Sequence, residues 1–408
     1  MPSQTSTLVD PLNPLTPEFL ENPYPTYHKM RDEAPVAWSE KSKYWMCTRY
    51  EDIRAMLGDM AYEKQLQRWK QVNPLLKMVP EVSALMKSRA VWMLNMNPPD
   101  HTRMRGLVNR AFTPTMVKGM RPHIESIANG LIDGLEGKNE FDFVSEFAFQ
   151  LPVTVIAEML GVPKEDREKF KHWSNTLTDT LEPSPNLDHL KKANKANEEL
   201  YEYLRPLVQD RRREPKNDLI SALVAAEEDG KKLTEEELLA NCILILVAGH
   251  ETTVNLIGNS VRMLLQHPDQ LALLKSNPEL VPGAIGETLR FESPVQTTRR
   301  LAGEDMELAG QKIKEGDMML LFMGAANRDP LQFPDPDKFD ITRDTKKHLS
   351  YGHGIHHCLG SSLADTEGQV ALETLLKRMP DMKVLPQKIE MRNTFALRGV
   401  KSLMVSPQ

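Results

Sequence analysis

Apolar residues recur every three or four positions along most of this chain, the spacing that gathers them on one face of a helix. This pattern predicts helices over Val117–Leu135, Phe147–Leu160, Leu190–Arg211 and Leu219–Glu227. Strands are predicted to be few and short: Val36–Ser39, Tyr44–Thr48, Met306–Ile313 and Met318–Met323. The first two strands flank a polar stretch and are expected to form a hairpin. We therefore expect a mainly α fold with small β-sheets.

A longer helix is predicted to begin at the capping box of Thr234 and Glu237 and to end at His267-Pro268. At about 1.5 Å per residue it would extend roughly 50 Å, enough to cross the molecule. Its most apolar part contains Ala248-Gly249-His250-Glu251-Thr252-Thr253. A purely structural core helix would avoid this acid and hydroxyl, so we expect something polar or flat beside it. The alternative is a packing glycine followed by an exposed Glu251 and threonines that bond to the helix backbone.

One cysteine lies between closely spaced glycines in Tyr351-Gly352-His353-Gly354-Ile355-His356-His357-Cys358-Leu359-Gly360. Glycine permits close approaches that a Cβ blocks, so Gly352, Gly354 and Gly360 allow a tight loop beneath a flat macrocycle. A helix predicted over Leu359–Arg378 follows, and its positive end favours a deprotonated sulfur. This arrangement indicates a thiolate bound to haem iron. A zinc site built from the neighbouring histidines is the alternative, although its ligands would crowd into one short segment.

Length, charge and cysteine content limit the classes of protein to which these motifs can belong. The length of 408 residues favours two or three domains, but no linker, repeat or low-complexity tract divides the chain, so we expect one domain over residues 1–408. The net charge of −6 gives no support to nucleic-acid binding. Three scattered cysteines argue against a disulfide scaffold and favour the cytoplasm. The first residues carry no signal pattern, and the longest apolar run, Cys242 to Ala248, is too short to span a bilayer, so no membrane association is expected.

The decapeptide matches aromatic-Gly-x-Gly-x-His-x-Cys-x-Gly and resembles the haem-binding loop of the cytochrome P450 family. The segment Ala248 to Thr253 resembles that family's oxygen-binding acid-alcohol motif, and Glu287 with Arg290 matches its ExxR motif in a helix predicted over Val281–Phe291. The resemblance covers nearly the entire chain. It implies the cytochrome P450 fold of the soluble bacterial branch. It also implies a haem-thiolate monooxygenase that inserts one oxygen atom of O2 into a hydrophobic small molecule, by hydroxylation or epoxidation.

The resemblance implies roles for individual residues. Cys358 would be the axial ligand of haem b, which is iron protoporphyrin IX, and Glu251 and Thr252 would relay protons. A buried network with a role in folding would join Glu287, Arg290 and Arg343.

The two haem propionates need cationic or hydrogen-bonding partners. Family resemblance assigns this role to His101 and Arg105 on a helix beginning near Asp100, to Arg300 at the opening of a predicted strand, and to His356. Arg103 or Arg299 would be able to replace its neighbour.

Substrate would lie above the haem, under a variable lid formed by Ala61 to Leu94. Its expected contacts are Leu244, Ile245, Ala248, Val295, Gln296, Phe395 and Leu397. The ligand would be a bulky apolar molecule such as a macrolide, steroid, terpenoid or fatty acid.

Electrons would come from a separate ferredoxin or flavodoxin with its reductase, since the sequence has no flavin or iron–sulfur motif. The expected docking residues on a monomeric enzyme are Arg110, Lys118, Lys346 and Lys347. Two other functions stay open: a peroxygenase that takes oxygen from hydrogen peroxide, and a non-catalytic haem- or zinc-binding sensor.

Two positions depart from the family pattern. Tyr351 stands where phenylalanine is usual, and its hydroxyl would alter the hydrogen bonding around the sulfur and the potential of the iron. Asp365 stands where a basic residue is common, which leaves the electrostatics of the docking face open.

Overall fold

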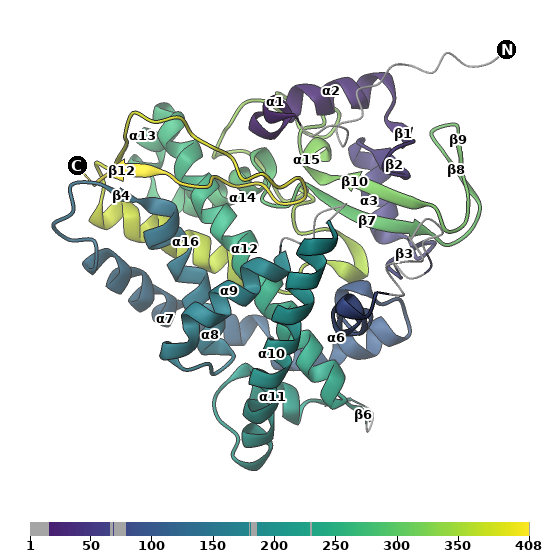
Figure 1. Cartoon of the computed structure of the whole chain (residues 1–408). Helices are drawn as coiled ribbons and strands as arrows, with labels where there is room; N and C mark the ends of the chain where they lie inside the picture. Colours follow the sequence, from purple (N-terminus) through teal and green to yellow (C-terminus); the bar gives the residue numbers. More distant parts are fainter. Residues whose placement is uncertain are drawn as a thin grey trace.

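The computed structural model describes residues 16–65, 68, 79–178, 180, 186–228 and 231–407. Helices form most of the body, with the largest sheet toward one side of it and the strands Phe141–Asp142 and Met404–Ser406 at the opposite side (Figure 1). The helices are α1 Pro17–Glu21, α2 Tyr24–Glu33, α3 Tyr50–Gly58, α5 Ser83–Ala90, α6 Asp100–Ala111, α7 Pro114–Asp133, α8 Gln150–Met159, α9 Arg167–Thr178, α10 Leu187–Arg213, α11 Leu219–Ala225, α12 Glu235–Gln266, α13 Pro268–Ser276, α14 Val281–Phe291, α15 Met323–Ala326 and α16 Ser361–Arg378. This confirms the expected mainly α fold.

The strands are β1 Val36–Ser39, β2 Tyr44–Cys47, β3 Tyr62–Glu63, β4 Phe141–Asp142, β5 Glu227–Glu228, β6 Lys231–Lys232, β7 Thr297–Ala302, β8 Met306–Leu308, β9 Gln311–Ile313, β10 Met318–Phe322, β11 Lys383–Val384 and β12 Met404–Ser406. The largest sheet has the order β1-β2-β10-β7-β3. In it β10 runs parallel to β2 and antiparallel to β7, with Met319 opposite Trp45 on one side and Arg300 on the other. The sheet therefore joins the start of the chain to its last third.

Two sequence predictions need correction here, and a third is confirmed. The expected helix over Phe147–Leu160 is preceded by a π-helical turn over Val144–Ala148, and the regular helix begins only at Gln150. Arg300 does not open its strand, because Thr297 and Thr298 already pair with β10. The sheet expected around Gly310 is present as a hairpin of β8 and β9 that turns at this glycine, where φ is +75°.

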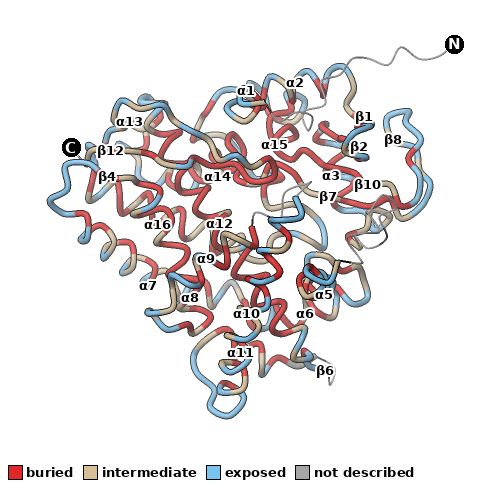
Figure 2. The backbone as a smooth tube through the Cα atoms, viewed as in Figure 1, coloured by how far each residue is buried: buried red, intermediate tan, exposed pale blue. Residues whose placement is uncertain are grey.

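The central element is α12, which packs against α8, α9, α14 and α16. Its capping box is present as predicted: the Thr234 hydroxyl accepts from the Glu237 N–H, and the Glu237 carboxylate accepts from the Thr234 N–H. Buried positions run along this helix and along α14 (Figure 2). Within the described ranges α12 alone is long and apolar enough to cross a membrane, and 83% of its most apolar window is buried inside the protein.

The motif with the expected role in folding is assembled around α14. The Glu287 carboxylate accepts two hydrogen bonds from Arg290, at 2.7 and 2.8 Å, and both side chains are fully buried. Arg343 reaches the same carboxylate at 3.4 Å, and the Asp340 N–H donates to it at 2.9 Å. Because Arg290 also donates to three backbone carbonyls, the network ties α14 to the segment preceding the cysteine loop.

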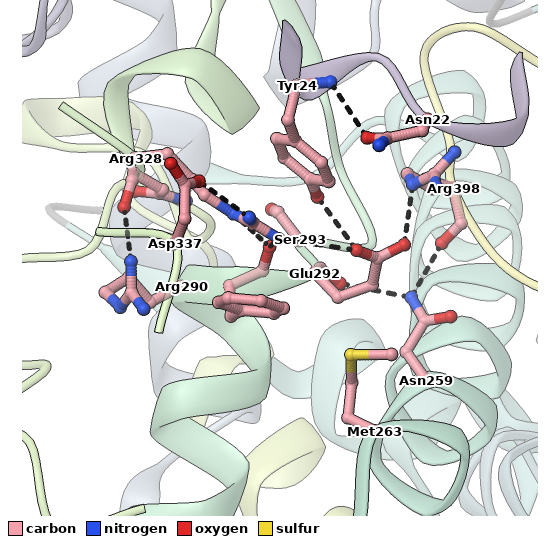
Figure 3. A network of polar contacts seen from close by, with 12 residues as sticks. Asn22, Tyr24, Asn259, Met263, Arg290, Glu292, Ser293, Arg328, Asp337 and Arg398 are labelled. Carbon is pink, nitrogen blue, oxygen red and sulfur yellow. Dashed lines mark hydrogen bonds and ion pairs between the residues drawn. The ribbon is translucent and has the colours of Figure 1, made fainter. Parts of the chain in front are cut away.

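A second buried carboxylate, Glu292, connects the two ends of the chain (Figure 3). Its oxygens accept from the Tyr24 hydroxyl at 3.1 Å and from Arg398 Nε at 2.6 Å. Arg262 and Arg328 approach it at 2.7 and 3.8 Å. Burial raises the pKa of Glu292, but the three arginines outweigh burial and lower the pKa to about 2.

Candidate active site

Between its two ends, the apolar helix α12 is interrupted by one less buried stretch. Its residues are buried almost throughout, yet Ala248 is exposed and Gly249 and Thr252 are half-buried. The Thr252 hydroxyl donates to the Ala248 carbonyl at 2.7 Å, and the Thr253 hydroxyl donates to the Gly249 carbonyl at 3.0 Å. Thr252 thus bonds to the backbone as expected, and its oxygen still presents lone pairs to the space beside Ala248.

Glu251 has a partner that sequence reasoning missed. Its carboxylate is 1% exposed and forms an ion pair with Arg392 Nη1 at 2.8 Å. The Arg392 side chain is 29% exposed, so the pair runs from the interior of α12 toward the surface. No local pattern links residues so far apart in the chain, and only the fold brings them together.

The cysteine loop has the tight form that Gly352 and Gly354 predicted. Gly352 and Gly354 adopt φ of +71° and +72°, and a Cβ on Gly354 would lie 2.6 Å from the Leu57 carbonyl oxygen. Gly360 has φ of −90°, and a Cβ there would meet no protein atom within 4 Å. The protein backbone therefore does not require glycine at 360, and the expected close approach of a flat macrocycle there stays a prediction.

Burial has a larger effect on Cys358 than the helix that follows it. Burial raises the pKa of the thiol, while the Gly360 N–H and the Arg105 guanidinium lower it by less. The sequence predicted that the start of the helix would favour the thiolate, and the local donors act in that direction but are outweighed. A bound metal ion would supply the missing positive charge, since a coordinating thiol loses its proton outright.

Four basic side chains converge next to this cysteine. His101 and Arg300 are buried, Arg105 and His356 are half-buried, and the rings of His101 and His356 lie 4.2 Å apart between centroids. Burial together with Lys64, His101 and Arg300 lowers the pKa of His356 to about 2. Within the described residues none of the four forms an ion pair with a carboxylate, and the buried His101 Nε2 has no hydrogen-bond partner there. The cluster fits a group that carries anions.

The two alternative propionate ligands are occupied elsewhere. Arg103 forms an ion pair with Glu237 at the start of α12, and Arg299 hydrogen-bonds to Tyr44. Lys64, which the sequence analysis did not single out, joins the cluster instead. It is 7% exposed, its Nζ donates to Thr298 Oγ1 at 3.1 Å, and burial with Arg300 places its pKa well below the usual value.

The predicted substrate contacts divide into two groups. Leu244, Ile245 and Ala248 share one face of α12, and Val295 forms an isolated antiparallel bridge with Leu397. These positions remain candidates for the wall of a pocket.

Gln296 and Phe395 belong to the scaffold instead. Gln296 Oε1 accepts from the Tyr27 hydroxyl at 3.1 Å, and Gln296 Nε2 donates to the Ser293 carbonyl at 2.7 Å, so both ends of the amide are used. Phe395 packs between the rings of Phe19 and Phe322, at 5.7 and 5.6 Å. Both side chains have a chemistry that suits the wall of a pocket. Contacts with residues far away in the chain hold them in the scaffold instead.

Part of the predicted lid can be described. It contains α5 and the short 3-10 turns Pro80–Val82 and Met93–Asn95, while residues 66, 67 and 69–78 lie outside the described residues. A cavity of about 270 Å³ separates the first part of the lid from the cysteine loop. Its lining includes Gly58, Tyr62, Asn97, Arg300 and His356.

The zinc alternative finds no ligand set in the described ranges: no group of three or more His, Cys, Asp or Glu side chains there is arranged to hold a metal ion. The four expected docking residues, Arg110, Lys118, Lys346 and Lys347, are all exposed.

Comparison with known proteins agrees with this geometry. A family model described as Cytochrome P450 matches residues 59–400. The biotin biosynthesis cytochrome P450 of Bacillus subtilis is 43% identical over 391 residues, which cover 95% of this chain and 97% of the relative. The cytochrome P450 monooxygenase PikC of Streptomyces venezuelae is 40% identical, covering 97% of this chain and 93% of the relative. The crystal structure of P450BioI in complex with hexadec-9Z-enoic acid ligated acyl carrier protein superimposes with a TM-score of 0.89 at 42% identity, covering 96% of this chain and 99% of that one.

Proposed function

The chain belongs to the cytochrome P450 family, and we propose that the residues around Cys358 hold haem b. The enzyme is a haem-thiolate monooxygenase. Haem, when bound, would supply the activation of O2: two electrons and two protons are consumed, one oxygen atom enters a C–H or C=C bond and the other leaves as water. The protein holds the cofactor, positions the substrate, limits the access of water and delivers protons.

The observation that carries the cofactor assignment is the cluster of basic side chains beside the cysteine. Two propionates would supply the anionic partners for His101, Arg105, Arg300 and His356, with Lys64 as a further donor. The His101 Nε2 would gain the partner that the described residues do not supply. Cys358 would bind the iron as a thiolate.

Proton delivery would use Glu251 and Thr252 on α12. Arg392 holds the Glu251 carboxylate at the inner end of a contact that reaches toward solvent. Thr252 donates to the Ala248 carbonyl, so its oxygen can accept a hydrogen bond in the space where oxygen would be reduced. Glu251 would hold the proton and Thr252 would position it at the reacting oxygen.

Substrate and electron donor are proposed from the same arrangement. The wall formed by Leu244, Ile245 and Ala248 suits an apolar molecule, and the hexadec-9Z-enoic acid carried by the acyl carrier protein in the P450BioI complex supports this class. The exposed Arg110, Lys118, Lys346 and Lys347 would dock an acidic ferredoxin or flavodoxin. The enzyme would act as one domain and one subunit in the cytoplasm.

The test is a reconstitution of the purified protein with haem. The wild type should give the carbon monoxide difference band of a thiolate-ligated haem, and Cys358→Ala should lose it. Turnover of an apolar substrate should depend on ferredoxin, its reductase and O2. Turnover that needs only hydrogen peroxide would indicate the peroxygenase, and a haem protein without turnover would indicate a sensor.

A further inference from the structure

Arg89, near the end of α5, has no carboxylate partner among the described residues. Its Nη2 donates to the Thr180 hydroxyl, and its guanidinium lies 5.3 Å from the centre of the Trp92 ring. Within the same residues its buried Nε has no hydrogen-bond acceptor. A guanidinium offers five donors, and the one at the buried Nε therefore needs an acceptor that Thr180 does not supply.

A second donor without a partner lies at the same place. Trp92 is 1% exposed, and its indole Nε1 is buried with no acceptor in the described ranges. An indole N–H normally finds a partner when it is buried. Two adjacent side chains on one short segment therefore lack the same thing, a hydrogen-bond acceptor.

This segment is fastened to the face of α12 that opens at Ala248. Asn241 accepts from the Met93 N–H at 3.0 Å and donates to the Val91 carbonyl at 3.0 Å, so it holds both neighbours of Trp92. Asn241 precedes Ala248 by two helical turns, so the two residues share a face. The rise between them is roughly 10 Å.

The local charge is positive, which favours a negatively charged hydrogen-bond acceptor. Burial lowers the pKa of Arg89 to about 10, and the nearby Arg299 contributes in the same direction. A structural link between α5 and Thr180 would not require a guanidinium, because a neutral donor would serve without the cost of burying a charge. The buried positive charge of Arg89 therefore favours an anionic group on a ligand.

We propose that Arg89 and Trp92 Nε1 bind the carboxylate of an elongated apolar acid whose chain runs along α12 to Ala248. The inference rests on the proposed function, because the chain of this acid would be the part that is oxidised. Because Asn241 and Ala248 lie roughly 10 Å apart along the helix axis, oxidation would occur far from the acid group, and short acids would not reach. Arg89 acts as a specificity-determining residue.

The experiment measures equilibrium binding by the shift of the haem band. The probes are tetradecanoic acid, its methyl ester and tetradecanol, and the haem content and carbon monoxide band of every sample are measured first. The wild type should prefer the acid to the ester and to the alcohol. Arg89→Gln should weaken the acid by roughly 10- to 100-fold, the value of a charge-assisted hydrogen bond, and leave the ester unchanged.

Three further variants separate charge recognition from damage to the fold. Arg89→Lys should restore part of the preference, and Trp92→Phe should weaken the acid alone because an aromatic ring is kept. Lys87→Gln removes an exposed charge from the same helix and should change nothing.

Equal binding of acid and ester by the wild type, or equal weakening of both by Arg89→Gln, overturns the inference while the thiolate band still supports the function. If Arg89→Gln does not hold haem, the test rests on two other measurements: the binding of the acid by Trp92→Phe and the preference of the wild type for the acid over the ester. A wild type without the thiolate band overturns the function itself.

Discussion

The Tyr351 hydroxyl donates a 2.7 Å hydrogen bond to Asp365 Oδ1 and so joins the two positions at which the chain departs from the family pattern. Tyr351 lies at the start of the cysteine loop, and Asp365 lies in the first turns of α16. Burial raises the pKa of Asp365, and the phenol opposes this shift by bonding to the carboxylate. A phenylalanine at 351 would leave Asp365 without this hydrogen-bond donor. The tyrosine at 351 and the aspartate at 365 therefore explain each other's presence.

Replacing Tyr351 by phenylalanine should destabilise the haem-loaded protein by about 1–3 kcal/mol, because a largely buried carboxylate loses its hydrogen-bond donor. Urea denaturation followed by the haem band measures the change. Asp365→Asn is the matched partner variant. The two effects should not add in the double variant, and strict additivity would show that the bond contributes nothing.

Glu287→Gln should cost roughly 3–5 kcal/mol, since it leaves the fully buried Arg290 without its counter-charge. Soluble yield and the thermal midpoint report the loss. Arg343→Gln is the control in the same network: its contact is longer, at 3.4 Å, and its side chain is 13% exposed, so a smaller loss is expected. Equal losses would contradict the central role assigned to the Glu287–Arg290 pair.

Thr252→Ala should keep haem and substrate binding but reduce product formation by roughly 10²-fold, within the range that proton transfer contributes. Reducing equivalents should appear as hydrogen peroxide, measured against product in one assay. Thr253→Ala provides a close match, because that hydroxyl makes the same type of bond to the helix backbone and is buried. If both variants behave alike, helix geometry and not proton delivery is responsible.

Folding stability should depend on pH through His250. Burial, followed by Arg392 and Lys171, lowers its pKa from 6.5 to about 3, so the unfolded chain binds its proton before the folded one does. The neutral histidine therefore stabilises fully above pH 6.5, and this contribution is lost as the pH falls from 6.5 toward 3. The expected slope is about 1.4 kcal/mol per pH unit. Chemical denaturation across this window should show a shallower slope for His250→Gln than for the wild type.

Elements with a strong local signal could be predicted from the sequence. The capping box located the start of α12, and the spacing of apolar residues identified the long helices, because both depend on near neighbours. The cysteine loop was readable for the same reason, since Gly352 and Gly354 are required by the local backbone.

Residues whose role depends on distant partners were not predictable in this way. Arg392 and Lys64 carry no motif, and their importance follows from Glu251 and Arg300, which only the fold places beside them. Gln296 was expected in the pocket although its amide bonds to Tyr27, a contact across 269 positions. Residue type alone does not show which way a side chain at the edge of a strand points.

The contact between Glu292 and Arg398 has a consequence for biosynthesis. Arg398 also donates to the Leu20 and Glu21 carbonyls, so one guanidinium near the carboxyl terminus fastens the first helix and neutralises a central acid. Arg262 and Arg328 contact the same carboxylate, but the donors to the Leu20 and Glu21 carbonyls exist only after residue 398 has been synthesised. A nascent chain that ends before residue 398 should therefore leave α1 unfastened and sensitive to protease.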